Sequence, residues 1–385
     1  MLNFDFYNPT NIIFGKGQVA QLSNLVPKGA RILITYGGNS AKSSGTLKEV
    51  QDALKDYEVM LFGGIEPNPR FETLIKAVEV IKNNNLDFIL AVGGGSVIDG
   101  TKFIAAAYYA DGDPWGIVAS FGQSVRKALP YGAILTLPAT GSEMNNGGVI
   151  TRASDNTKLP MMNRLLYPRF SILDPTKSYT LPTKQLANGV VDAYVHVIEQ
   201  YLTYPVNAHV QDRFSEGILQ TLIEIGPAVI NNPKDYELQA NLMWCATMAL
   251  NGLIGAGVPH DWATHMLGHE ITALHGLDHA QTLAIVLPSM LQHRKKRKRD
   301  KLLQYARRVW NINHEDEEKT IDEAIEKTRN FFTSLGVKTS LSEYQLGPEI
   351  IEPILTQLEE HHMTKLGEHN DVTPDVCRKI LQLSM

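Results

Sequence analysis

Residues 87–99 read Asp-Phe-Ile-Leu-Ala-Val-Gly-Gly-Gly-Ser-Val-Ile-Asp, an apolar run followed directly by three glycines and a serine. A short apolar run bounded by turn residues is typical of a strand that is buried on both faces of a parallel sheet. Glycines at the turn allow a phosphate group to approach the backbone N–H groups and the positive end of the following helix. The stretch therefore predicts a strand, a turn and a helix that together bind a nucleotide phosphate.

Two further apolar runs end in the same way. Residues 31–38 read Arg-Ile-Leu-Ile-Thr-Tyr-Gly-Gly, and residues 132–142 end in Ala-Thr-Gly-Ser. The glycine run alone is also compatible with a plain tight turn, because Ile98 occupies the place of the third glycine in the dinucleotide-binding fingerprint. Ligands bind beyond the carboxyl ends of parallel strands, so three such turns, with Thr136 and Thr140 at the third, favour nucleotide binding.

The character of the sequence changes near residue 182. Helical patterns at 45–55 and 71–83 separate the first strands, which is typical of a parallel sheet covered on both faces. The later part contains long amphipathic stretches and no convincing strand. These stretches are 211–223, 238–253 and 319–335. We expect an α/β domain with a Rossmann-like parallel sheet over residues 1–181 and an all-α domain over residues 182–385.

Five polar residues in the second part suggest a metal site. Asp192 and His196 are four residues apart, as are His265 and His269, so each pair lies on one face of a helix; His279 follows after a glycine-bearing turn. A buried histidine is usually a satisfied core residue, but leaving this many polar groups unpartnered would cost about 1–3 kcal/mol each. Carboxylate and imidazole suit Fe²⁺ or Zn²⁺, and the absence of nearby cysteine argues against a closed structural site. The pattern predicts a catalytic divalent metal site, and it leaves open which of the five are ligands.

Composition is that of a soluble globular enzyme. The 385 residues are 43% hydrophobic and 20% charged with a net charge of −5, which gives no general attraction to nucleic acid or anionic lipid. Residues 1–6 lack the features of a signal peptide, and no apolar run reaches transmembrane length. We therefore expect a cytoplasmic protein with no membrane or nucleic-acid partner. The basic run 294–299 lacks interleaved aromatic residues and is interpreted as a solvated helix end.

These motifs together resemble the iron-containing (group III) alcohol dehydrogenase family. The residues that carry the resemblance are Gly93–Asp99, Thr140–Glu143, Asp192, His196, His265, His269 and His279. The similarity runs nearly end to end and is stronger to the NADP-dependent bacterial aldehyde reductases, or butanol dehydrogenases, of this family. It implies a dehydroquinate synthase-like architecture, with a dinucleotide-binding domain, a helical domain and an active site in the cleft between them.

The resemblance also implies roles for individual residues. The implied metal ligands are Asp192, His196, His265 and His279, while His269 lies near the nicotinamide without binding the metal. The implied cofactor-binding residues are Gly37, Gly38, Ser40, Gly94, Gly95, Ser96, Asp99, Thr136, Thr140 and Lys158. NAD-preferring members carry an aspartate where this chain has Gly38, so NADP(H) is favoured here because no carboxylate repels the 2′-phosphate and Ser40 can bind it. His260 and His275 have no implied role, and we expect surface or structural duty for both.

The expected activity is hydride transfer between NADPH and a small aldehyde that one Fe²⁺ or Zn²⁺ ion per chain polarises. The proton would come from His269 or from water relayed through the cofactor ribose. A polyol dehydrogenase of the same family, acting on glycerol or propanediol, is the nearer alternative. A metallohydrolase is the alternative from another class, but it leaves the turn at 93–96 without a purpose. The extended-looking stretch 4–14 is expected to pair two copies into a homodimer.

Overall fold

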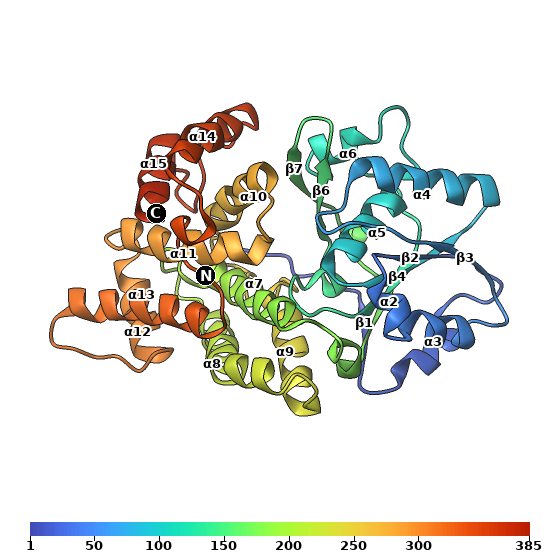
Figure 1. Cartoon of the computed structure of the whole chain (residues 1–385), viewed down its shortest axis with the longest axis horizontal. Coiled ribbons are helices and arrows are strands. Elements are labelled where there is room, and N and C mark those ends of the chain that lie inside the picture. Colours follow the sequence, from blue (N-terminus) through green and yellow to red (C-terminus); the bar gives the residue numbers. More distant parts are fainter. The chain divides into compact units, whose positions relative to one another are not determined.

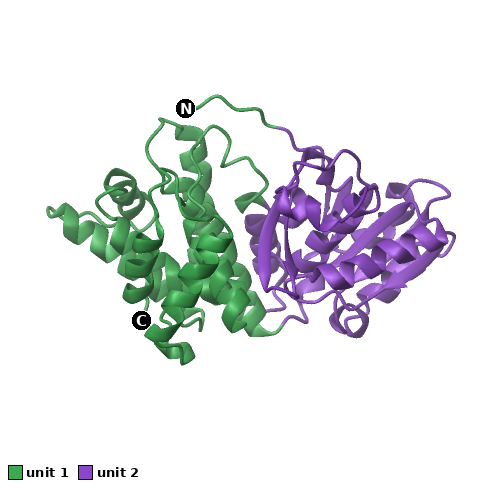
Figure 2. Ribbon diagram, turned by 90° about the horizontal axis from the view of Figure 1, so that it is seen from above, with its two compact units in different colours: residues 1–6, 182–232, 248–385 green, residues 7–181, 233–247 purple.

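The computed structural model describes residues 1–385 and divides them into two compact units, which are coloured separately in Figure 2. The α/β unit consists of residues 7–181 and 233–247, and the helical unit consists of residues 1–6, 182–232 and 248–385. The expected single break after residue 181 therefore does not describe the units fully. Segment 1–6 precedes the break but belongs to the helical unit, and segment 233–247 follows the break but belongs to the α/β unit.

Specific contacts explain this grouping. In segment 233–247, the buried Gln239 accepts a hydrogen bond of 2.8 Å from Ser178 Oγ, and the Trp244 ring lies 6.1 Å from that of Phe14. In segment 1–6, the Leu2 N–H donates to the Gly257 carbonyl at 2.9 Å. None of these contacts is signalled by the local sequence pattern.

A six-stranded parallel sheet lies at the centre of the α/β unit (Figure 1). In spatial order its strands are β1 (Asn11–Phe14), β8 (Phe170–Leu173), β5 (Tyr131–Leu135), β4 (Phe88–Gly93), β2 (Arg31–Tyr36) and β3 (Glu58–Phe62). The three strands predicted from the apolar runs are the adjacent strands β5, β4 and β2. Their glycine-bearing ends therefore lie at one edge of the sheet, where ligands bind in such folds.

Helices cover both faces of this sheet. Side chains alternate along β4, so Phe88, Leu90 and Val92 belong to one core cluster and Ile89 and Ala91 to the other. The predicted helices at 45–55 and 71–83 are α3 and α4. The helices of this unit are α1 (Leu22–Leu25), α2 (Ser40–Ser43), α3 (Thr46–Ala53), α4 (Phe71–Asn84), α5 (Gly95–Ala107), α6 (Trp115–Ala119) and most of α9 (Tyr236–Ala249), with 3₁₀ turns η1 (Gln18–Gln21), η2 (Ser142–Met144), η3 (Arg164–Leu166) and η4 (Pro175–Ser178).

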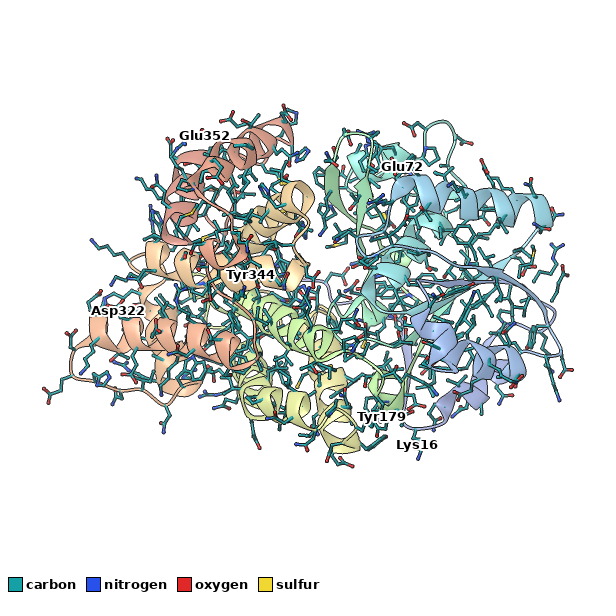
Figure 3. All side chains as sticks on the ribbon, viewed as in Figure 1. Lys16, Glu72, Tyr179, Asp322, Tyr344 and Glu352 are labelled. Carbon is teal, nitrogen blue, oxygen red and sulfur yellow. The ribbon has the colours of Figure 1, made fainter.

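An antiparallel hairpin of β6 (Gly147–Arg152) and β7 (Thr157–Met162) was not predicted. Glu72 of α4, labelled in Figure 3, holds its turn by accepting hydrogen bonds from the N–H groups of Ala153 at 3.0 Å and Ser154 at 3.3 Å. The hairpin carries Lys158, whose Nζ donates to Asn68 Oδ1 at 2.9 Å.

The helical unit contains no strand, as predicted. Its helices are α7 (Thr183–Tyr201), α8 (His209–Asn231), the end of α9 (Tyr236–Ala249), α10 (Ala263–His275), α11 (His279–Arg294), α12 (Arg299–Arg308), α13 (Glu317–Ser334), α14 (Ile351–Glu360) and α15 (Pro374–Leu383), with η5 (Ser342–Tyr344) and η6 (Pro348–Ile350). Helix α11 packs against both α7 and α10 (Figure 1). None of the helices combines the length and the apolar character needed to cross a membrane.

The basic run 294–299 joins α11 to α12, and it is not wholly a solvated face. Lys298 is buried, and its Nζ lies 2.7 Å from both Asp261 Oδ2 and Glu368 Oε1. Arg294 is also buried and pairs with Asp371. The interpretation as a solvated helix end is therefore wrong for two of the six residues, because acidic partners from distant segments compensate their charges.

Candidate metal centre and cofactor site

Three helices of the helical unit bring the predicted metal residues together. Asp192 and His196 lie one turn apart on α7, and His265 and His269 lie one turn apart on α10. His279 is the first residue of α11. That helix begins there because Asp278 and Gln281 form a reciprocal capping box.

The cluster centres on one buried carboxylate oxygen. Asp192 Oδ1 lies 3.6 Å from Nε2 of His196, 3.9 Å from that of His265 and 3.7 Å from that of His279. Ligand atoms about 2.1 Å from a tetrahedral ion lie ~3.4 Å from one another, so these separations fit four donors around one ion. Neither Asp192 Oδ1 nor His265 Nε2 has a hydrogen-bond partner, although both are buried. A cation bound among these atoms would satisfy both of them.

The closest grouping of potential ligands comprises Asp192, His265 and His279, whose ligand atoms all lie within 4.8 Å of one another. His196 joins this group through Asp192, and its ring stacks on that of His265 with centroids 4.6 Å apart. His269 lies at the edge of the cluster, with its ring centroid 4.9 Å from that of His279. All five residues singled out from the sequence are thus neighbours.

Electrostatics in the cluster holds Asp192 and His196 in the forms that bind a cation, whereas His265 must release a proton when a metal ion binds. Burial raises the pKa of Asp192, but the nearby imidazoles outweigh it and hold that pKa well below its ordinary value. Burial lowers the pKa of His196 to about 4. For His265, burial lowers the pKa, but the Glu199 and Asp192 carboxylates outweigh it and raise the pKa to about 9. An ionised carboxylate and a neutral imidazole are the forms that bind metal ions.

Sequence reasoning missed two side chains around the cluster. Glu199 of α7 is buried and accepts hydrogen bonds from the first turn of α10 and from His265 Nδ1. Its position, three residues after His196, is the only sequence signal for it. The Trp262 ring lies edge-on to the ring of His265 at 5.4 Å. Trp262 Nε1 donates to His260 Nδ1 at 3.2 Å, so His260 contacts a side chain that packs beside the cluster.

The turn between β4 and α5 excludes side chains. A Cβ atom on Gly95 would lie 2.4 Å from Thr140 Oγ1, and one on Gly94 would lie 3.0 Å from Leu137 Cβ. Ser96 Oγ accepts a hydrogen bond of 3.4 Å from the Asn68 N–H, and Thr136, directly after β5, donates its N–H to Gly93 O at 3.0 Å. The backbone of this turn is therefore closely packed by its neighbours.

Asp99, one turn into α5, has both carboxylate oxygens bound within the α/β unit. Ser142 Oγ donates to one at 2.6 Å, and the Val149 N–H donates to the other at 3.0 Å. Lys102 Nζ donates to Ser142 Oγ and Asn145 Oδ1, both at 2.8 Å. Burial lowers the pKa of Lys102 to about 8. These contacts connect α5 to the start of β6.

The turn after β2 is the most open of the three. Gly38 and Ser40 are exposed, and Gly37 is half-buried. A Cβ atom built on Gly38 meets nothing within 4 Å, and this residue is not among those with positive φ. The structure therefore has room for a side chain at the position where NAD-preferring members of the resembled family carry an aspartate.

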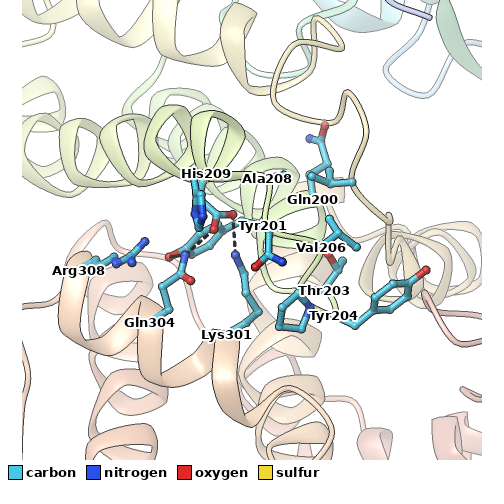
Figure 4. A pocket seen from close by; sticks show the side chains of 14 residues that line it. Gln200, Tyr201, Thr203, Tyr204, Val206, Ala208, His209, Lys301, Gln304 and Arg308 are labelled. Atoms are coloured by element: carbon cyan, nitrogen blue, oxygen red, sulfur yellow. Dashed lines mark hydrogen bonds and ion pairs between the residues drawn. The ribbon is translucent and has the colours of Figure 1, made fainter. Parts of the chain in front are cut away.

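A polar hollow lies elsewhere in the helical unit (Figure 4) and is lined in part by Tyr201, Lys301 and Gln304. Lys301 Nζ lies 2.6 Å from Asp212 Oδ1, and Gln304 Nε2 donates to Tyr201 OH at 3.1 Å. These four polar side chains are thus engaged with one another. None of the five predicted metal residues lines it.

Comparison with known proteins identifies the class of this chain. The family profile described as iron-containing alcohol dehydrogenase matches residues 9–175, and the profile for the C-terminal part of that family matches residues 186–382. The chain belongs to the iron-containing alcohol dehydrogenase family. The family resemblance and the fold class predicted from the sequence are therefore confirmed.

Individual relatives are similar over nearly the whole chain. It is 57% identical to the NADPH-dependent aldehyde reductase YqhD of Escherichia coli (strain K12) over 384 residues, which cover 99% of each protein. It is 42% identical to the probable NADH-dependent butanol dehydrogenase 1 of Bacillus subtilis (strain 168) over 359 residues, 92% of each. The crystal structure of E. coli K-12 YqhD superposes with a TM-score of 0.99 at 56% identity and covers 100% of this chain and 99% of that one.

Proposed function

We propose that this protein is an NADP(H)- and metal-dependent aldehyde reductase that also acts as an alcohol dehydrogenase on short-chain, butanal-like substrates. The observation that carries the proposal is the position of Asp192 Oδ1, 3.6, 3.9 and 3.7 Å from three imidazole Nε2 atoms. The name of the E. coli relative, which is 57% identical over 99% of both chains, supports the reaction type.

Asp192, His196, His265 and His279 are the proposed ligands of one divalent ion. This set of three nitrogen donors and one oxygen donor suits Fe²⁺ and Zn²⁺ alike, and metal availability decides between such ions. When bound, the ion supplies a Lewis acid for the carbonyl oxygen and NADPH supplies the hydride. His269 is our candidate for holding the proton that the product hydroxyl takes up, because it is buried beside His279.

The cofactor is proposed to bind at the carboxyl ends of β2, β4 and β5. Gly94, Gly95 and Ser96 form the phosphate-binding turn, where N–H groups at the start of the 13-residue helix α5 favour an anion. The residues proposed on the nicotinamide side are Thr136, Thr140 and Lys158, with Asp99 nearby in α5.

Cofactor choice is proposed to depend on the turn after β2, which includes Gly37, Gly38 and Ser40. The names of the two relatives differ, because the E. coli protein is called NADPH-dependent and the Bacillus protein NADH-dependent. Family membership alone therefore does not decide the cofactor. The absence of a carboxylate at Gly38 and the exposed Ser40 hydroxyl support NADP(H).

We further propose a cytoplasmic homodimer. β1 is an edge strand that pairs with β8 on one side only, and such edges are ready to pair with another chain. Phe14, at the end of β1, is exposed and offers apolar area. Light scattering coupled to size exclusion should give twice the mass of the 42.7 kDa chain. A single-chain mass would contradict the dimer.

The proposed function is tested by a metal assay combined with initial rates. The purified protein should contain about one transition-metal ion per chain, and the NADPH-dependent reduction of butanal should exceed both the NADH-dependent rate and the oxidation of glycerol or propanediol. Preferred oxidation of these polyols would favour a polyol dehydrogenase instead. Failure of added NADPH to change its fluorescence would contradict the dinucleotide site.

A further inference from the structure

Glu199 links the two helices that carry four of the five clustered residues. It lies on α7, two turns after Asp192, and its side chain is buried. Its carboxylate accepts hydrogen bonds from the Thr264 N–H at 2.6 Å and the His265 N–H at 3.2 Å. The same carboxylate accepts the Nδ1–H group of the His265 ring. One side chain therefore binds both the backbone and the imidazole of a proposed metal ligand.

These contacts satisfy the start of α10. The first N–H groups of a helix have no partner within the helix, and a carboxylate placed there is favoured. Trp262, the residue before the helix, caps none of them with its side chain. Asp261 Oδ1 accepts from the Ala263 N–H at 3.1 Å, while Glu199 accepts from the next two. Two buried carboxylates thus share the cap, and only Glu199 also contacts an imidazole ring.

The ring contact decides which nitrogen of His265 is available. In the neutral ring that binds a metal ion, Nδ1–H donates a hydrogen bond to Glu199, and the lone pair then lies on Nε2, 3.9 Å from Asp192 Oδ1. Carboxylates that accept from the second nitrogen of a metal-binding histidine fix its tautomer and orientation. Glu199 lies on the same helix as Asp192 and His196. By binding the ring of His265, it therefore also fixes where this residue of α10 lies relative to the two proposed ligands of α7.

We propose that Glu199 is a positioning residue of the metal centre, which fixes the tautomer and orientation of His265 and thereby raises metal affinity. This inference rests on the proposed function, because it requires His265 to bind the ion through Nε2. Glu199 itself does not bind the metal, and its oxygens are already occupied by three donors from Thr264 and His265.

Asp261 provides a matched control within the same cap. It is buried, and its Oδ2 lies 2.7 Å from Lys298 Nζ. Its backbone N–H donates to Glu199 O at 2.9 Å. Like Glu199 it stabilises the first turn of α10, but its side chain forms no contact with a proposed ligand. Asp261→Asn therefore weakens the cap and the pair with Lys298 while it leaves all three hydrogen bonds of the Glu199 carboxylate to Thr264 and His265 in place.

The test measures metal affinity without measuring turnover. Zn²⁺ affinity is determined by competition with a chromophoric chelator, and Co²⁺ absorption reports the geometry of the ligands. Glu199→Gln should weaken Zn²⁺ binding about 10- to 100-fold and alter the Co²⁺ spectrum. Glu199→Asp keeps the charge but shortens its reach, so its affinity should lie between those of Glu199→Gln and the wild type. Asp261→Asn should lower Tm and leave the Zn²⁺ affinity and the Co²⁺ spectrum unchanged.

Two results would overturn the inference while leaving the proposed function intact. One is wild-type affinity and an unchanged Co²⁺ spectrum in Glu199→Gln, or in Glu199→Asp if the first variant does not fold. The other is an equal loss of affinity in Asp261→Asn, which would mean that Glu199 acts only through the helix cap. If the wild-type protein bound neither Zn²⁺ nor Co²⁺ at one ion per chain, the proposed function and the inference would both fail.

Discussion

Asn188 Nδ2 donates a hydrogen bond of 2.9 Å to Asp278 Oδ2 and so ties α7 to the residue that caps α11. Asp192 follows Asn188 by one turn of α7, and His279 follows Asp278 directly. The bond therefore sets the distance between two proposed ligands that are 87 residues apart in the sequence, from 192 to 279.

Asn188→Ala should weaken metal binding while the fold is retained. A hydrogen bond of this kind contributes about 0.5–1.5 kcal/mol, so a roughly two- to tenfold loss of Zn²⁺ affinity is expected. Lys184→Ala is the matched control, because Lys184 also pairs with Asp278 at 2.8 Å but is largely exposed. Exposed pairs contribute little, so Lys184→Ala should keep wild-type affinity in chelator competition. Lys184 and Asn188 both lie on α7 and contact the same Asp278 oxygen, so equal losses in both variants would show that Asn188 has no particular role in the link between α7 and α11.

Asp192→Ala should abolish metal binding and activity, because it removes the only anionic member of the proposed ligand set. The α/β unit has its own core, so the far-UV circular dichroism spectrum should remain that of a folded protein. His269→Ala is the comparison, since it should lower turnover and retain the metal. Elemental analysis checks both variants. A stoichiometric ion in Asp192→Ala, or a lost ion in His269→Ala, would contradict the respective assignment.

Gly38→Asp should shift the cofactor preference toward NAD(H). Like charges in close contact cost about 1 kcal/mol or more, and ~1.4 kcal/mol corresponds to a tenfold change in binding. A Cβ atom on Gly38 has no neighbour within 4 Å, so steric strain should not mask the effect. Gly38→Asn, with similar size and no charge, is the control. kcat/KM with each cofactor is measured, and an equal drop for NADPH and NADH in Gly38→Asp would place the 2′-phosphate elsewhere.

Gly95→Ala should disturb the turn between β4 and α5, because its Cβ would lie 2.4 Å from Thr140 Oγ1. Overpacking of this kind typically costs about 1–3 kcal/mol of the free energy of unfolding. Affinity for NADPH, followed by fluorescence, should fall as well. Gly116→Ala, at a helical glycine whose Cβ would meet nothing within 4 Å, should leave both quantities near their wild-type values. Unchanged NADPH binding in Gly95→Ala would argue against this turn as the phosphate site.

The parts of the fold that were predicted correctly have strong local patterns. β2, β4 and β5 are continuous apolar runs, and each i,i+4 pair needs only helix geometry to share a face. The β6–β7 hairpin was missed because its second strand contains Pro160, which counts against a strand. Glu199 was missed because its partners Thr264 and His265 lie more than 60 residues away, at separations of 65 and 66. Lys298 likewise looked like part of a solvated run because its acidic partners come from distant segments.

The assignment of residues 233–247 to the α/β unit limits how this protein can be divided. Met243 contributes to a core cluster of that unit, and Thr247 Oγ1 donates to the buried Glu143 carboxylate at 2.5 Å. A gene split after residue 181 would give an amino-terminal polypeptide that lacks Met243 and Thr247. This polypeptide would contain a cavity where Met243 packs, and the buried Glu143 carboxylate would lose the hydrogen bond from Thr247. Reassembly from two separately synthesised pieces would then require the second piece to insert α9 into the first. Insertions, fusions and chimeras between relatives are therefore better placed in surface loops than at the break after residue 181.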